Sequence, residues 1–237
     1  MTDKATRVTA ASPPTPWLPQ GTVYGTLMNF TDEHAALAAQ MDAPPYKAAP
    51  QAPVLYIKTA NTFSAHGSAI TLPAQAAHVQ VRACIGLVFK KSTQVASTIK
   101  HFTAIDNIAS VVLFNDLTVP HESFYRPPVK FKCIDGFLCT GQLPHALRDV
   151  AALDALTITV RINGIIVQTF STADTVRSAA QLVSDVAEFI DLQDGDVMLL
   201  GSPFNAPLAA AGDAIEISAP GFAPLRHTLV AHTEAQP

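Results

Sequence analysis

The clearest candidate for chemistry in this sequence is an aspartate at the end of an apolar strand. Asp116 follows Asn115 directly after the apolar run of residues 109–114, and a polar, proline-broken stretch then continues to residue 128. Such a stretch indicates an exposed or site-forming loop. A carboxylate at its start can belong to a site, or it can simply form a turn.

Other polar residues offer weaker patterns. Arg126, next to Tyr125, could bind a dicarboxylate because a guanidinium fork suits carboxylates, although a surface arginine beside a proline turn is the alternative. His34 could act as a base if another group orients it. Ser202 lacks the Gly-x-Ser-x-Gly elbow of a nucleophilic serine. The other histidines show no metal-ligand spacing and are interpreted as surface or turn residues: His66, His78, His101, His121, His145, His227 and His232.

Composition limits the classes of function. Of the 237 residues 49% are hydrophobic and only 14% are charged, so much of the chain must lie in a core or a subunit interface. The net charge is −4 and no basic stripe is present, so nucleic acid is not expected as a partner. The three cysteines lack Cys-x-x-Cys spacing, which favours a reducing cytoplasm over a disulfide framework or a zinc knuckle. The sequence has no long apolar window and no signal-peptide pattern, so we expect no membrane association.

The elements that must position these residues belong to one domain behind an extended arm. Residues 1–20 are rich in proline and lack periodicity, which indicates an arm that Trp17 could tether. Residues 21–237 are expected to form a single domain. Helices are expected from a cap at Asp32 to Met41 and over 178–189. Strands are expected at 22–29, 54–57, 79–89, 109–114, 156–162, 165–169, 197–200, 215–217 and near 229.

The arrangement of these elements predicts the fold class. The dipeptide Asn163-Gly164 between two strands predicts a tight hairpin. Residues 79–89 alternate as one long strand with one face in the core. Strands outnumber helices and do not alternate regularly with them, which favours a mixed, β-dominated α+β fold over a doubly wound sheet.

Three separated segments resemble the fumarylacetoacetate hydrolase superfamily, over roughly residues 22–230. The segments are Asn115-Asp116 with Lys132-Cys133-Ile134-Asp135-Gly136-Phe137, then Asn163-Gly164 leading to Leu200-Gly201-Ser202-Pro203, and Gly25 to Asn29-Phe30 with His34. The superfamily fold, a mixed β-roll with few helices, agrees with the class expected from the strand pattern.

Within the superfamily, the sequence is most similar to the amino-terminal half of the bifunctional isomerase/decarboxylases of 4-hydroxyphenylacetate (homoprotocatechuate) degradation. That likeness is carried by Glu122-Ser123-Phe124-Tyr125-Arg126-Pro127, continuing through Lys130 and Lys132 to Asp135-Gly136-Phe137. The resemblance implies that Lys132 contacts the substrate. The candidate catalytic residues are therefore Lys132, His34 and Arg126.

The resemblance also indicates that metal ligands are missing. Relatives bind Mg²⁺ or Mn²⁺ through a Glu-x-Glu pair on one strand and the aspartate of Asn-Asp on another, and the dication polarises the keto acid. Asp116 matches the aspartate, but Arg82 and Cys84 stand at the glutamate positions, or Val81 and Ala83 in a register one residue earlier. A guanidinium cannot ligate Mg²⁺ and a thiol is too soft a donor. We interpret Asp116 as the remnant of a metal site, expect Arg82 to pair with it, and expect this chain to bind no metal.

A second departure concerns hydrolysis. Relatives that cleave with water use a His-x-x-Glu dyad on a helix, whereas His34 is followed three residues later by Leu37. His34 is therefore interpreted as a remnant, and an activated water is not expected.

The resemblance implies a subunit of the enzyme that decarboxylates 5-oxopent-3-ene-1,2,5-tricarboxylate and isomerises 2-hydroxyhepta-2,4-diene-1,7-dioate. Relatives carry two such domains on one chain, so we expect a homodimer or a heterodimer with a Glu-x-Glu paralogue, which would hold the Mg²⁺ or Mn²⁺. The substrate would be a small oxo-dicarboxylate or tricarboxylate. Two alternatives stay open: a stand-alone remodelled tautomerase, decarboxylase or hydrolase, and a non-catalytic structural or regulatory binding module.

Overall fold

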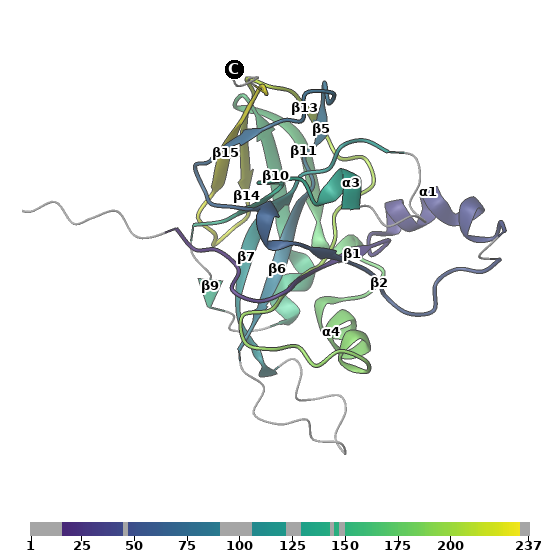
Figure 1. Ribbon diagram of the computed structural model, residues 1–237. Coiled ribbons are helices and arrows are strands. Elements are labelled where there is room, and N and C mark those ends of the chain that lie inside the picture. Colours follow the sequence, from purple (N-terminus) through teal and green to yellow (C-terminus); the bar gives the residue numbers. More distant parts are fainter. Residues whose placement is uncertain are drawn as a thin grey trace, which may run out of the picture.

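The computed structural model is built mainly from β-strands, which confirms the β-dominated α+β class with few helices (Figure 1). It describes residues 16–44, 47–90, 106–121, 129–142, 145–146 and 150–232. Residues 1–15, most of the expected arm, lie outside these ranges. Near the start of the described chain, Trp17 packs edge-on against Phe114, with ring centroids 6.1 Å apart. Its carbonyl also accepts a hydrogen bond of 2.9 Å from Thr140 Oγ1, so Trp17 is joined to the domain.

The larger sheet runs through the middle of the domain. Its strand order is β2-β1-β12-β6-β7-β8-β3, and β9 pairs with β7. The bounds are β1 Val23–Leu27, β2 Val54–Lys58, β3 Phe63–Ser64, β6 Ala83–Phe89, β7 Ile108–Asp116, β8 Leu138–Thr140, β9 His145–Ala146 and β12 Val197–Leu199. The central strands β6 and β7 pair antiparallel along most of their length. Asp116, the last residue of β7, therefore stands at the end of a buried central strand.

A second sheet packs beside the first. Its order is β11-β10-β14-β15-β4, with bounds β4 Ala69–Thr71, β10 Thr157–Ile162, β11 Ile165–Ser171, β14 Ala214–Ser218 and β15 Leu225–Val230. The hairpin expected at Asn163-Gly164 is confirmed: Ile162 pairs with Ile165 across the turn. Both turn residues have positive φ, 52° and 80°, as a two-residue turn between twisted strands requires. Figure 1 shows β10, β14 and β15 gathered at the end of the molecule opposite α4.

The strand expected over residues 79–89 is broken in two. Val79–Gln80 forms β5, which pairs with β13, Leu208–Ala209, and the chain then crosses to the larger sheet as β6. At the crossing, Val81 N donates to Pro207 O at 2.8 Å. The expectation of a single core face is wrong as well, because every residue of β6 is buried. One face of β6 meets the second sheet and the other is covered by residues that include Trp17.

Few helices accompany the sheets. Those that lie fully within the described residues are α1 Thr31–Met41, α3 Val129–Lys132 and α4 Ala179–Ala187, with short 3₁₀ turns η1 Ala60–Thr62, η2 Ala151–Ala155 and η3 Thr172–Asp174. None of the described helices is long and apolar enough to cross a membrane. Figure 1 shows α1 at the edge of the molecule, beyond the ends of β1 and β2.

The ends of the two longer helices differ in how they are capped. α4 lies within the predicted range 178–189, and the Oγ of its N-cap Ser178 accepts a hydrogen bond from Gln181 N at 3.2 Å. The predicted cap of α1 is wrong: Phe30 is the N-cap, and Asp32 lies inside the first turn. The Asp32 carboxylate instead accepts from the backbone of Glu33 and Phe204, so it ties the start of α1 to a distant loop.

Candidate functional site

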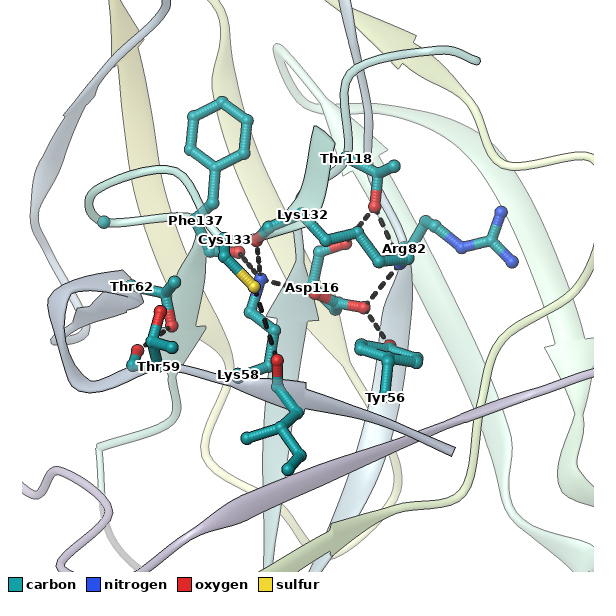
Figure 2. A network of polar contacts seen from close by, with 12 residues as sticks. Tyr56, Lys58, Thr59, Thr62, Arg82, Asp116, Thr118, Lys132, Cys133 and Phe137 are labelled. Atoms are coloured by element: carbon teal, nitrogen blue, oxygen red, sulfur yellow. Dashed lines mark hydrogen bonds and ion pairs between the residues drawn. The ribbon is translucent and has the colours of Figure 1, made fainter. Parts of the chain in front are cut away.

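A cluster of buried charged side chains lies where β7 ends. Asp116 at the end of β7, Lys58 at the end of β2 and Lys132 at the end of α3 are each no more than 3% exposed. Tyr56 stands two residues before Lys58 on β2, so the two side chains share a face of the strand. Figure 2 shows Tyr56 and Lys58 of β2 and Lys132 of α3 converging on the Asp116 carboxylate.

Both oxygens of Asp116 contact cations. Lys58 Nζ lies 2.9 Å from Oδ1, and Lys132 Nζ lies 2.8 Å from Oδ2, which also accepts a hydrogen bond from the Tyr56 hydroxyl. Lys132 Nζ donates to Thr118 Oγ1 at 2.8 Å as well. Lys58 Nζ donates to the carbonyl oxygens of Lys132 and Phe137. The carboxylate is thus neutralised by groups of the protein itself.

These neighbours fix the protonation of the cluster. Burial by itself would raise the pKa of Asp116, but the charges of Lys132 and Lys58 outweigh it and hold this pKa well below its ordinary value. Burial lowers the pKa of Lys132 to about 8, with Arg82 and Lys58 adding to the effect and Asp116 opposing it. Burial and the charge of Asp116 raise the pKa of Tyr56 well above its ordinary value. Near neutral pH, Asp116 is an anion between two cations, and Tyr56 is a neutral donor.

Arg82 does not pair with Asp116, and that expectation is wrong. Its Nη2 donates to Glu33 Oε1 at 2.7 Å, and its Nε donates to Ser202 Oγ at 2.9 Å. Figure 2 shows the guanidinium turned away from the carboxylate. The physical reason is that Lys58 and Lys132 already occupy both Asp116 oxygens, whereas the buried carboxylate of Glu33 needs a cation.

Cys84 stands on β6 beside the same cluster. It pairs in register with Phe114, two residues before Asp116 on β7, and its side chain is buried. Burial, together with the negative charge of Asp116, raises the pKa of this thiol far above its ordinary value. A thiol that stays protonated is a poor nucleophile and a poor metal ligand.

The side chains of the cluster do not fit a hard dication. Within the described ranges, no group of three or more His, Cys, Asp or Glu side chains is placed to hold a metal ion. The buried charges here are the cations Lys58, Arg82 and Lys132 and the anions Glu33 and Asp116, which gives a balance of +1. A dication would enter a cluster that is already positive, and both oxygens of Asp116 are engaged. Mg²⁺ and Mn²⁺ require the opposite, several available oxygen ligands with net negative charge.

A cavity of about 510 Å³ opens beside the cluster, between α1, β5, β13 and the segment that follows β7. Its lining residues are Leu37, Gln40, Gln80, Arg82, Pro120, His121, Phe204, Asn205, Ala206 and Leu208. Arg82 is the lining residue that carries a permanent charge, since burial lowers the pKa of His121. Asp116 and its two lysines are not among the lining residues, so the cavity ends at Arg82.

The predicted site residues are therefore separated. Lys132 lies against Asp116, but His34 is half-buried on α1 and is not among the residues that line the cavity. Leu37, three residues after His34, does line it. Arg126 and Tyr125 lie outside the described residues. The roles of Lys132, His34 and Arg126 in catalysis stay predictions.

Sequence reasoning missed three members of the cluster. Tyr56 and Lys58 were visible as polar groups two residues apart on an otherwise apolar strand, a spacing that directs both to one face. Glu33 gave a weaker signal, an acidic residue in the first turn of a helix, which normally faces solvent. It is buried here because its carboxylate accepts from Met28 N at 2.6 Å and pairs with Arg82.

Comparison with known proteins places the sequence in a family. The profile described as fumarylacetoacetate (FAA) hydrolase C-terminal matches residues 22–230, which is most of the chain. The chain belongs to the fumarylacetoacetate hydrolase family. It is 39% identical over 215 residues to the 4-hydroxyphenylacetate degradation bifunctional isomerase/decarboxylase of Salmonella dublin, and 37% identical over the same length to the Escherichia coli protein of that name. Each alignment covers 91% of this chain and 48% of the relative, so the chain spans about half the length of these curated relatives.

Solved structures of fumarylacetoacetate hydrolase family members share the fold. A probable 2-hydroxyhepta-2,4-diene-1,7-dioate isomerase from Mycobacterium abscessus superposes with a TM-score of 0.72 at 22% identity, covering 91% of this chain and 77% of that one. A 2-hydroxyhepta-2,4-diene-1,7-dioate isomerase from Mycobacterium marinum gives a TM-score of 0.68 at 21% identity, with 90% and 75% covered. At these identities the likeness concerns the fold, and the β-rich roll expected from the sequence is confirmed.

Proposed function

We propose that this chain is one subunit of a 4-hydroxyphenylacetate-pathway enzyme that decarboxylates 5-oxopent-3-ene-1,2,5-tricarboxylate and isomerises 2-hydroxyhepta-2,4-diene-1,7-dioate. The proposal is supported by the identity to bifunctional isomerase/decarboxylases over 91% of the chain. The alignment covers only 48% of those relatives, so each carries further sequence of about the same length. A paralogue that carries the Glu-x-Glu pair would supply that part here, as a separate subunit holding Mg²⁺ or Mn²⁺.

The observation that carries the proposal is the pairing of Asp116 with two lysines. Its carboxylate lies between two ammonium groups, and Arg82 and Cys84 stand where oxygen ligands are expected. The chain would therefore contribute the fold, the subunit interface and a binding cavity, while its partner supplies the metal-dependent chemistry. The three free cysteines agree with the reducing cytoplasm that such a catabolic enzyme occupies.

Mixing experiments test this function. The purified chain, a Glu-x-Glu paralogue from the same organism and their mixture are assayed for decarboxylation and isomerisation, each with Mg²⁺ and with EDTA. We expect activity, or stimulation above the paralogue by itself, in the mixture with Mg²⁺ and no activity of this chain in EDTA. The matched control is the paralogue with both glutamates changed to glutamine, which should abolish activity in the mixture. A mixture no more active than the paralogue would refute the subunit role.

A second candidate is a metal-independent tautomerase or decarboxylase acting without a partner, with Lys132, Arg126 and His34 as its working groups. The observation in its favour is the Lys132 ammonium, whose pKa is lowered to about 8 by burial, a value suited to proton transfer near neutral pH. Turnover by the chain in EDTA, lost in Lys132→Met, would select this candidate. If neither the chain nor the mixture shows an effect, the chain is a non-catalytic structural or regulatory binding module.

A further inference from the structure

Arg82 stands at the boundary between the buried cluster and the cavity. The residue is 5% exposed, yet it lines the cavity. Its bonds to Glu33 and Ser202 use Nη2 and Nε, and no hydrogen bond from Nη1 is found within the described ranges. A guanidinium presents donors on all three nitrogens, so one edge of Arg82 remains able to donate to a ligand in the cavity.

The charge around Arg82 favours an anion in that place. Three buried cations face two buried anions. Glu33 balances Arg82, so the excess of one positive charge comes from the adjacent lysines Lys58 and Lys132, which share Asp116. A buried charge without a partner is costly, and this cost falls when an opposite charge approaches. A carboxylate in the cavity next to Arg82 would bring the balance to zero.

The rest of the cavity fits a hydrocarbon chain with few polar groups. Half of its lining is apolar, from Leu37, Pro120, Phe204, Ala206 and Leu208. Polar atoms that could orient a ligand come from the amide side chains Gln40, Gln80 and Asn205. A volume of about 510 Å³ suits a small molecule buried over most of its surface.

We propose that this cavity binds small unsaturated carboxylic acids directly, with Arg82 taking the carboxylate and no metal ion between protein and ligand. The site differs from a chelating metal centre because a guanidinium fork recognises the carboxylate itself. The choice of an unsaturated oxo-acid as natural ligand rests on the proposed function, whereas metal-free carboxylate binding does not depend on any turnover.

Calorimetry on the full-length chain in EDTA tests the site. The probe is (2E,4E)-hexa-2,4-dienoate, and its uncharged amide is the control ligand of the same shape. We expect the acid to bind, added Mg²⁺ to leave its affinity unchanged, and the amide to bind on the order of tenfold more weakly or not at all. Equal binding of the amide, absence of acid binding, or a requirement for Mg²⁺ would each overturn the proposal.

Variants assign the binding to Arg82. Arg82→Met should weaken dienoate binding by on the order of tenfold or more. Because that change leaves Glu33 as an unpaired buried carboxylate, the double variant Arg82→Met with Glu33→Gln serves as the folded test, since glutamine can still accept from Met28 N. Arg161→Met is the matched control, an arginine paired with Glu216 far along the chain and absent from the cavity lining. Unchanged affinity in a folded double variant would rule Arg82 out.

This test and the mixing experiment fail separately. Dienoate binding with no stimulation of a paralogue would remove the proposed subunit role and leave the anion site standing. Stimulation in the mixture with no dienoate binding by the chain would remove the anion site and leave the subunit role.

Discussion

The buried charges around β6 and β7 fall into two neighbouring halves that have opposite states. Around Asp116, Lys58 contacts one carboxylate oxygen and Lys132 and Tyr56 contact the other, and none of these residues lines the cavity. Around Arg82, a cation is held by one carboxylate and one hydroxyl, and its side chain borders the cavity. The first half is closed by the protein's own groups. The second keeps a charged edge available to a small molecule.

The two halves show how the protein balances buried charges with its own groups. Asp116 must be paired, because an isolated buried charge is costly, and internal lysines satisfy that need. Arg82 must be paired too, and Glu33 of α1 serves it. Substitutions in one half should therefore have effects that differ from those in the other.

The largest effect is expected from Asp116→Asn. The substitution keeps the shape but leaves the ammonium groups of Lys58 and Lys132 buried without their shared anion, which should cost about 4–5 kcal/mol of unfolding free energy. Urea unfolding measures it, with the exposed Asp42→Asn as the control, which should change stability by less than about 0.5 kcal/mol. A loss as small as that of the control would show that the closed half is solvated.

In the open half, Arg82→Met should destabilise the fold by about 3 kcal/mol, because Glu33 is left charged and unpaired. Adding Glu33→Gln should restore much of that loss, since both charges are then absent and Met28 N keeps its acceptor. A double-mutant cycle in urea measures the coupling between the two residues. Strictly additive losses would mean that the Arg82–Glu33 pair does not hold α1 to β6.

Much of this architecture was predictable, and the reason lies in local chemistry. The hairpin at Asn163-Gly164 and the helix α4 follow from turn residues and apolar spacing, and both are present. The single strand over 79–89 was predicted wrongly. After β5 the chain gives up its pairing with β13 and joins the larger sheet as β6, and the alternation of apolar residues does not encode such a change of partner.

The site was harder to predict than the fold. Lys132 and Asp116 were singled out from motifs, and they do meet. The partner of Arg82 was predicted wrongly because two lysines from distant segments had already saturated Asp116, and Glu33 looked like a solvent-facing helix residue. Long-range pairing among buried charges depends on which groups the fold brings together, and spacing along the chain carries little of that information.

The neutral pair Asn115–His227, beside the charged cluster, shows how burial alone affects stability. Asn115 Nδ2 lies 2.8 Å from His227 Nε2, on the opposite face of β7 from Asp116. The interpretation of His227 as a surface or turn residue is wrong, because it is buried within β15. Burial lowers the pKa of His227 from 6.5 to about 4, so the unfolded chain takes up this proton first as the pH falls. Stability contributed by neutral His227 is full above pH 6.5 and is lost as the pH falls toward 4.

This titration should cost about 2 kcal/mol between pH 7.5 and pH 5. Urea unfolding at the two pH values measures it, and His227→Gln, which keeps an acceptor but cannot be protonated, provides the reference. The wild-type loss should exceed that of the variant by this amount. Identical pH dependence in the two proteins would show that His227 is not buried as a neutral ring.

The smallest effect is expected from Thr118→Val. It removes the hydroxyl that accepts from Lys132 Nζ at 2.8 Å and donates to Asp116 O at 3.1 Å, and it leaves the Lys132–Asp116 ion pair intact. Relative to Thr118→Ser, which keeps the hydroxyl, the loss should be about 1 kcal/mol in urea unfolding. Because Thr118 belongs to the closed half, the affinity for hexa-2,4-dienoate should stay within about twofold of wild type. A larger shift in affinity would mean that Lys132 and Arg82 respond to the ligand as one unit. The closed and open halves would then be a single anion site whose charge is distributed over all three cations.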